Sequence, residues 1–543
     1  MSQEGVTQGD PLAMPFYALS TLPLIEKLPP ILQVWYADDA SASGNVSDLK
    51  TWWDELNHLG PGYGYITNAS KTWLVTKSQY YSAAKAVFQG TNVNVTCEGR
   101  PYLGSPLGTA DYIQQYVKMK VASWNKELIL LSSIALAQPQ AAYAAYTHGL
   151  SSRWSYLART TRGISHLFVP LEDTLRNLFF PAITGQPSPN DDLRNIFALP
   201  ARCGGLGMNK PELTSVSEYE SSLRICRPLI DLILKQDSQY HMKVFCEQLS
   251  LRKDVKCERT KYVSAIIDEL RQSLSVELKR GLLLASEKGA SVWLTCLPIK
   301  EFGFCLHRRA FLDSLALRYG WSLSNTPLTC ACGTSFSVNH ALSCSKGGFP
   351  LIRHNEIRDL TAQLLTEVCN NVRLEPDLQP VHENVSLGAS VNSTDGARLD
   401  IVVNGFWGGR YETMFLDVRI FNPYADSNRS TSLTTTYLKH ENEKRRTYES
   451  RVREVEHASF TPLVMSATGG MAKQATVFYK HLASLLADKR DTSYSATMNW
   501  LRCTISFSLL RSAIQCVRGA RSSYHSPDWG AQIDFVIAQS HLT

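Results

Sequence analysis

The sequence lacks the features of secreted and membrane proteins. Its first residues, Met1–Glu4, contain neither the basic nor the apolar region of a signal peptide. The longest apolar stretch, Leu128–Tyr146, is interrupted by Ser132 and Ser133 and again by Gln138–Gln140. It therefore predicts buried helices and not a membrane span. We expect a protein without membrane partners that is located in the nucleus or the cytoplasm.

The chain also has few cysteines and a small net charge. Thirteen cysteines among 543 residues are too few for a disulfide scaffold, so a reducing compartment is expected. The formal net charge of +6 is compatible with nucleic-acid binding but does not establish it. There is no internal repeat and no low-complexity tract, and a hydrophobic content of 44% is ordinary for globular protein. At this length we expect several domains, each with its own core.

Two adjacent acids near the N-terminus are the most informative feature that is present. Asp38 and Asp39 follow the apolar residues Val34–Tyr36 and precede the small residues Ala40–Gly44. The pattern predicts a strand, a tight turn and a second strand, with the acids at the turn. Acids are common at turns without any function. Clustered carboxylates are also what two-metal phosphoryl-transfer sites need to hold cations about 3.5–4 Å apart.

Three further motifs accompany this pair. Gly5–Leu12 precedes it and contains Asp10, an expected helix N-cap that is followed by proline. Asn68–Thr72 and Tyr102–Gly104 follow it. In order and spacing, the four features resemble palm motifs B, C, D and E of reverse transcriptases, which are RNA-directed DNA polymerases.

The resemblance implies that Asp38 and Asp39 bind catalytic Mg²⁺ and that Lys71 lies near the incoming deoxynucleotide. This sequence also departs from the family pattern, because the polymerase needs a further carboxylate from motif A, which precedes motif B. Only Met1–Gly9 precede Asp10, and their single acid, Glu4, is not on an apolar strand. We therefore expect a chain truncated before motif A that does not extend a primer by itself.

The middle of the chain is predicted to be helical. Val117, Val121, Trp124 and Leu128 recur on one helical face, at the place where a polymerase thumb follows the palm. Leu199–Gly207 is rich in glycine and resembles a segment found after the palm in LINE-type (non-LTR) reverse transcriptases. We expect it to form a tight turn with close backbone approach, and not a nucleotide site, because it lacks the strand-loop-helix phosphate pattern.

A cysteine-histidine cluster follows the helical segments. Cys330, Cys332, His340 and Cys344 offer four ligands of the kind that tetrahedral zinc prefers. The single residue between the first two is tighter than the usual two, and the alternative is unmetallated thiols near a core histidine. With all four positions filled, the zinc would be structural and its knuckle DNA-facing. Two nearby side chains are substitute ligands: Cys305 and His307.

A second group of acids lies beyond the cluster. Asp400 stands at the start of one predicted strand and Asp417 within another, and Gly405–Gly409 between them is a turn signal. Glu356 lies at the start of a predicted helix that precedes both strands. An acid from a helix and acids from two neighbouring strands form a compact Mg²⁺ or Mn²⁺ site, which would activate water against a phosphodiester.

This second pattern is similar to the PD-(D/E)XK nuclease core. The resemblance implies that Asp400 and Asp417 bind the nuclease metal and that Glu356 assists as the helix acid. Arg419 stands where lysine is expected, and an arginine cannot act as a general base. Lys444, on the helix that follows, is a candidate for a migrated lysine. The alternative is that these acids are strand ends and that the helix is solvated.

Together, the polymerase motifs, the knuckle and the nuclease pattern resemble the branch of LINE-type retroelements with a restriction-like endonuclease. The expected fold class is α+β and multidomain. The expected domains are a partial palm (1–105), a helical thumb (106–210), a helical linker (211–325), the zinc knuckle (326–348), an α/β nuclease (349–525) and a tail (526–543). The resemblance implies DNA and RNA as partners. The rival hypothesis is a catalytically inactive nucleic-acid-binding remnant.

Overall fold

A computed structural model describes residues 9–237, 242–381, 387–409 and 412–519. These residues form two compact units. Unit 1 lies within residues 1–127, 150–174 and 210–266, and unit 2 within 128–149, 175–209 and 267–543. Helices and strands are both present, which confirms the α+β class. The chain passes between the units several times, so the segments 106–210 and 211–325 are each divided between both.

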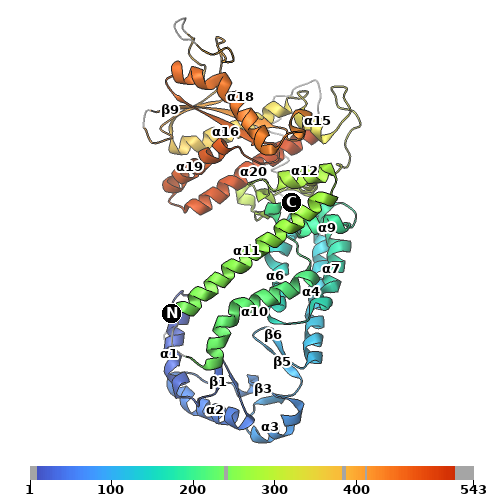
Figure 1. The fold of residues 1–543 in the computed structure, drawn as a ribbon, viewed down its shortest axis with the longest axis vertical. Helices are drawn as coiled ribbons and strands as arrows, with labels where there is room; N and C mark the ends of the chain where they lie inside the picture. The colour runs from blue at the N-terminus through green and yellow to red at the C-terminus, as the bar shows by residue number, and fades with distance from the viewer. Residues whose placement is uncertain (1–8, 238–241, 382–386, 410–411, 520–543) are drawn as a thin grey trace. The chain divides into compact units, whose positions relative to one another are not determined.

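The acidic hairpin lies in unit 1 (Figure 1). Strands β1 (Leu32–Tyr36) and β2 (Asp39–Ser43) form a two-stranded antiparallel sheet, as the sequence predicted. Helix α1 (Ala13–Lys27) and helix α2 (Val46–Leu59) pack beside it around a small apolar core. The central side chains of this core are Leu24, Leu28, Trp52 and Leu56.

Every sheet that the structure describes in unit 1 has only two strands. The two other pairs are β3 (Trp73–Val75) with β4 (Asn94–Thr96), and β5 (Gly99–Tyr102) with β6 (Ser105–Gly108). The remaining α-helices of this unit are α3 (Tyr81–Val87), α6 (Ser151–Thr160), α7 (Val169–Thr174), α10 (Pro211–Lys235) and most of α11 (Met242–Ser273). Helix α4 (Ala110–Ala135) begins in unit 1 and ends in unit 2.

Unit 2 contains a four-stranded sheet in the order β10-β9-β8-β7. Strand β8 (Ile401–Asn404) pairs antiparallel with β7 (Asn370–Leu374) and with β9 (Thr413–Phe421). Strand β10 (Ser459–Ser466) runs parallel to β9 along its full length. The hairpin that the sequence predicted around the Gly405–Gly409 turn is thus confirmed.

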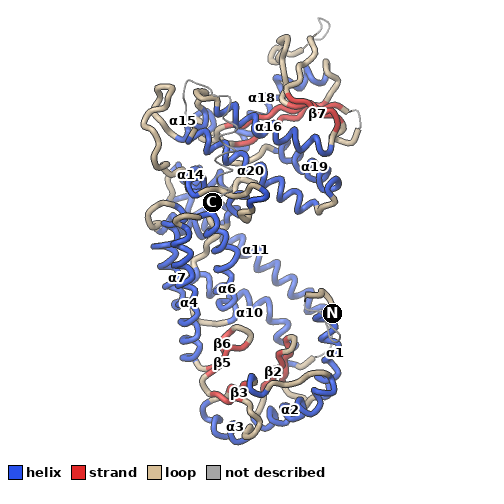
Figure 2. Tube along the Cα trace, turned by 180° about the vertical axis from the view of Figure 1, so that it is seen from behind, coloured by secondary structure: helices blue, strands red, loops and turns tan. Residues whose placement is uncertain are grey.

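Helices cover both faces of this sheet (Figures 1 and 2). Leu416 and Val418 point toward α16 (Phe349–Val368), α19 (Lys473–Arg490) and α20 (Tyr494–Arg518), which share a large buried core with them. Val402 and Phe415 point the other way, toward α18 (Leu433–Glu454). The alternation follows from the two-residue period of a strand, and it makes the sheet the middle of three layers.

The rest of unit 2 is helical. Its α-helices are α5 (Pro139–Ala145), α8 (Phe180–Thr184), α9 (Asp191–Ala198), α12 (Val276–Ala285), α13 (Val292–Thr295), α14 (Arg308–Tyr319), α15 (Val338–Ser343) and α17 (Asp426–Arg429). The glycine-rich segment is the predicted tight turn, because a Cβ on Gly205 would lie 2.0 Å from the Leu199 carbonyl oxygen. Among the described residues, no helix is long and apolar enough to span a membrane.

Candidate functional site

The two strand acids lie side by side. Ile401 pairs with Leu416, which places Asp400, just before β8, next to Asp417 in β9. The backbone amide of Asp400 donates to the carbonyl oxygen of Leu416 at 3.2 Å. Cross-strand neighbours in an antiparallel pair project to the same face. For Asp417 that is the face covered by α18, where the helix side chains can reach it.

Asp417 is buried and paired with a lysine. Only 6% of Asp417 is exposed, and the Lys444 Nζ of α18 lies 2.7 Å from its Oδ2. Burial raises the pKa of Asp417 to about 6, the Lys444 ammonium opposes this shift, and the charge of Asp400 adds to it. The lysine that the sequence placed on the following helix thus contacts the acid on β9.

Asp400 is held through both of its carboxylate oxygens. Its Oδ1 lies 3.0 Å from the Nε2 of His354, and its Oδ2 accepts a hydrogen bond of 2.6 Å from the Val418 amide. Sequence reasoning missed His354. The spacing along α16 could have indicated that His354 faces inward, because it lies one turn before the buried residue Arg358.

Two predicted site residues do not join this group. Glu356 is exposed on α16, two residues and about 200° from His354, and its charge acts on Arg511 of α20. Arg419 shares a face of β9 with Asp417 but is exposed, and its charge acts on His440. The helix thus contributes His354 to the acid pair, where the sequence had suggested Glu356.

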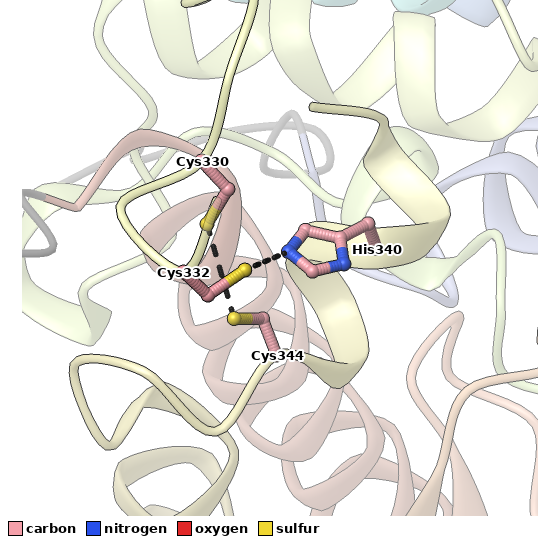
Figure 3. A group of neighbouring side chains, drawn as sticks. All are labelled: Cys330, Cys332, His340 and Cys344. Carbon is pink, nitrogen blue, oxygen red and sulfur yellow. Dashed lines mark hydrogen bonds between the residues drawn. The ribbon is translucent and has the colours of Figure 1, made fainter. Parts of the chain in front are cut away.

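The cysteine-histidine cluster is compact (Figure 3). The ligand atoms of Cys330, Cys332, His340 and Cys344 all lie within 4.8 Å of one another. The Sγ atoms of Cys330 and Cys344 are 3.8 Å apart, and the Sγ of Cys332 is 3.2 Å from the Nε2 of His340. Tetrahedral zinc with bonds of about 2.0–2.3 Å requires ligand separations of roughly this size. The four side chains therefore fit a metal ion. The structure thus supports the predicted metal-binding cluster.

Local structure explains how the cluster forms. Gly333, with a φ of +88°, turns the chain after Cys332, and the Ser337 hydroxyl caps α15 by accepting from the His340 amide at 3.0 Å. Hydrogen bonds with Thr334 lower the pKa of the Cys332 thiol to about 6, which favours the thiolate that binds metal. Two substitute ligands are not part of the cluster: Cys305 and His307. The ring of His307 instead caps α14, accepting from the Ala310 amide.

The polymerase-like acids lie in a different environment. Asp38 and Asp39 are both exposed at the β1–β2 turn, and among the described residues neither carboxylate has an ion pair. Lys71 is exposed in a short 3₁₀ helix, Ala69–Lys71. The Tyr65 hydroxyl donates to the Asp38 carbonyl oxygen at 2.8 Å. Among the described residues, Asp38 and Asp39 therefore form no carboxylate cage.

Two neighbouring motifs are placed in part. The Ser41 hydroxyl of β2 donates to the Tyr102 hydroxyl at 3.0 Å, which brings the predicted motif E turn to the hairpin. The Asp10 carboxylate accepts from the Leu12 amide at 2.7 Å, but α1 begins at Ala13, two residues later than its sequence predicts. Glu4 and the first half of the motif B segment, residues 5–8, lie outside the described residues.

No protein-family model matches the chain, and no curated protein matches it.

Proposed function

We propose that unit 2 contains a metal-dependent DNA endonuclease of the PD-(D/E)XK type. We further propose that the chain is the C-terminal portion of a LINE-type retroelement reverse transcriptase. In this account Asp400 and Asp417 bind Mg²⁺ or Mn²⁺, and Lys444 assists them. The phosphodiester backbone of DNA is the substrate.

The observation that carries the proposal is the contact between Lys444 and Asp417 beside Asp400. Burying a carboxylate costs free energy unless a partner compensates it. Here two carboxylates are brought together on one face of a sheet and only one contacts an ammonium group. Such an excess of negative charge in a half-buried site is suited to a divalent cation.

The chemistry follows from the donor set. A divalent ion would activate a water molecule and offset charge on the scissile phosphate. Asp400 is oriented by His354 and by the Val418 amide, so its carboxylate is fixed before substrate binds. Lys444, which is 20% exposed, is placed to stabilise negative charge on the phosphate or to orient the water.

The proposal extends to the rest of the chain. Zinc is the metal that best suits three cysteines and one histidine in a closed site. Asp38 and Asp39 would be two Mg²⁺ ligands of an incomplete polymerase site. DNA and RNA would be partners of the chain, and deoxynucleotides would bind in an intact element that supplies a further carboxylate. The proposal therefore includes the expectation that the purified chain does not extend a primer on an RNA template.

One observation favours the rival function of nucleic-acid binding without cleavage. Among the described residues, the cysteine-histidine cluster is the only group of three or more metal-ligating side chains within metal-binding distance. The nuclease site has two carboxylates, and Glu356 does not supply a third. A remnant that keeps the fold would bind DNA in a salt-sensitive manner and leave it intact.

Nicking of supercoiled plasmid DNA separates the two functions. The wild-type chain is expected to nick in Mg²⁺ or Mn²⁺, and Asp400→Ala and Asp417→Ala are expected to abolish nicking. Asp377→Ala is the matched control, because Asp377 is an exposed aspartate of the same unit, paired with Arg398 at the surface. DNA binding without nicking by the wild type would support the rival, and equal nicking by all variants would reject the assigned site.

A further inference from the structure

A buried asparagine lies between the strand that carries Asp417 and the cysteine-histidine cluster. Asn422 directly follows β9 and is only 6% exposed. It lies five residues beyond Asp417 on the same stretch of chain. A restraint on its side chain therefore also restrains the end of the strand that carries Asp417.

The side-chain amide of Asn422 is bound to helix α15. Its Nδ2 lies 3.0 Å from the carbonyl oxygen and 2.8 Å from the Oδ1 of Asn339, and 2.8 Å from the hydroxyl of Ser343. Both partners are direct neighbours of cluster ligands, since Asn339 precedes His340 and Ser343 precedes Cys344. One amide group thus contacts α15 beside His340 and again at its last residue, beside Cys344.

The other groups of Asn422 are also occupied. Its Oδ1 accepts from the Tyr424 amide at 3.0 Å, and its carbonyl oxygen accepts from the Asn428 side chain at 2.9 Å. Arg280 donates to the carbonyl oxygens of Pro423 and Asn428, which holds the same loop from α12. The asparagine is therefore fixed on both sides and cannot turn away from α15 without losing several buried hydrogen bonds.

Apolar packing holds α15 against the same body. Ala341 and Leu342 are buried, and they share a core with Phe349 of α16 and with Ala513 and Val517 of α20. The cluster is accordingly built into unit 2 and is not an appendage on a linker.

We propose that Asn422 is a positioning residue that couples metal binding at the cysteine-histidine cluster to β9. The ion fixes His340 and Cys344, α15 then holds Asn422, and Asn422 holds the end of the strand on which Asp417 stands. The catalytic consequence of this coupling rests on the proposed nuclease function, whereas the coupling itself does not.

Hydrogen-deuterium exchange of the β9 amides tests the coupling. Full-length wild-type protein is measured without metal and after addition of one equivalent of Zn²⁺, with zinc content determined on the same samples. We expect zinc to slow exchange in β9 by about tenfold, the size that one or two buried hydrogen bonds produce. In Asn422→Ala, zinc is expected to bind with the same stoichiometry while the response of β9 disappears.

Asn404→Ala is the matched control, because Asn404 ends the neighbouring strand β8 and its side-chain amide donates within the hairpin, to the Thr413 hydroxyl at 3.1 Å. It is expected to keep the full response. If Asn422→Ala does not fold, Ser343→Ala removes one acceptor from the α15 side and is expected to reduce the response. A β9 response that is absent in the wild type, or unchanged in both link variants, would overturn the proposal.

Plasmid nicking on the same samples keeps the two proposals apart. If the nuclease function holds, zinc raises the nicking rate of the wild type and of Asn404→Ala but not of Asn422→Ala. If no sample nicks DNA, the nuclease function fails while the exchange data still decide the coupling.

Discussion

The two units each contain a pair of aspartates at a strand hairpin, yet the pairs have different surroundings. Asp38 and Asp39 project from the turn of a two-stranded sheet and are exposed. Asp417 lies in a four-stranded sheet covered by helices and Asp400 directly precedes its strand β8, and each contacts a basic side chain from a helix. The sequence singled out both pairs for the same reason, the chemistry of paired carboxylates.

The difference teaches that the suitability of an acid pair for metal binding depends on the burial and the neighbouring side chains that the fold provides. In unit 2, helices on both faces of the sheet exclude water and supply His354 and Lys444. In unit 1, the hairpin pairs with no third strand among the described residues, and both of its acids are exposed. Burial and partners, and not the acids alone, distinguish the proposed nuclease site from the proposed polymerase remnant.

The largest expected effect comes from neutralising each pair in turn. Asp400→Asn with Asp417→Asn is expected to lower the plasmid-nicking rate by more than about a hundredfold, since metal-ion chemistry contributes several kcal/mol. Asp38→Asn with Asp39→Asn is expected to leave the rate within about twofold, because these residues belong to a separate unit. Comparable losses in both double variants would remove the contrast between the two pairs.

A second effect separates a buried ion pair from an exposed one. Lys444→Met leaves the buried Asp417 without its partner and is expected to cost about 3 kcal/mol or more of unfolding free energy. Lys50→Met removes the partner of Asp54, which is 56% exposed in unit 1, and is expected to cost less than about 0.5 kcal/mol. Urea unfolding measures both, and similar costs would show that burial of Asp417 is not what matters.

A partly buried carboxyl outside both pairs tests whether burial shifts titration away from the two proposed sites. Burial raises the pKa of Glu287 to about 7, while hydrogen bonds with Tyr437 and Ser466 oppose the shift. The folded protein therefore holds a proton that the unfolded chain releases, and this contribution to stability is lost as pH rises through about 7. The glutamine side chain of the Glu287→Gln variant is neutral at every pH. The unfolding free energy of this variant, relative to that of the wild type, should therefore rise by up to about 3 kcal/mol between about pH 5 and pH 8.

Urea unfolding at the two pH values measures this difference. Glu375→Gln is a suitable control, because Glu375 is an exposed carboxyl of the same unit with a side chain 52% exposed. A pH-independent difference for Glu287→Gln would show that its carboxyl titrates normally in the folded state.

Much of the secondary structure near the sites followed from the sequence. The strand-turn-strand around Asp38, the tight turn at Gly205 and the β8–β9 hairpin all lie where local patterns predict them. These features depend on neighbouring residues, on apolar periodicity and on glycine, which a single sequence displays directly.

The partners within the nuclease site were harder to predict. Lys444 was one of two candidates for the lysine position, and the packing of α18 on β9 brings it to Asp417. His354 was missed and Glu356 was singled out, because the choice between them depends on the rotation of α16 about its axis. That rotation is set by tertiary packing against the sheet and α20, which no local pattern specifies.

The most direct test of the central claim is a count of bound Mn²⁺ by electron paramagnetic resonance on zinc-loaded protein. The account predicts that Asp417→Asn loses one bound ion relative to the wild type and that Asp38→Asn with Asp39→Asn loses no ion from that site. An unchanged count in Asp417→Asn would contradict the assignment of the buried pair as a metal centre.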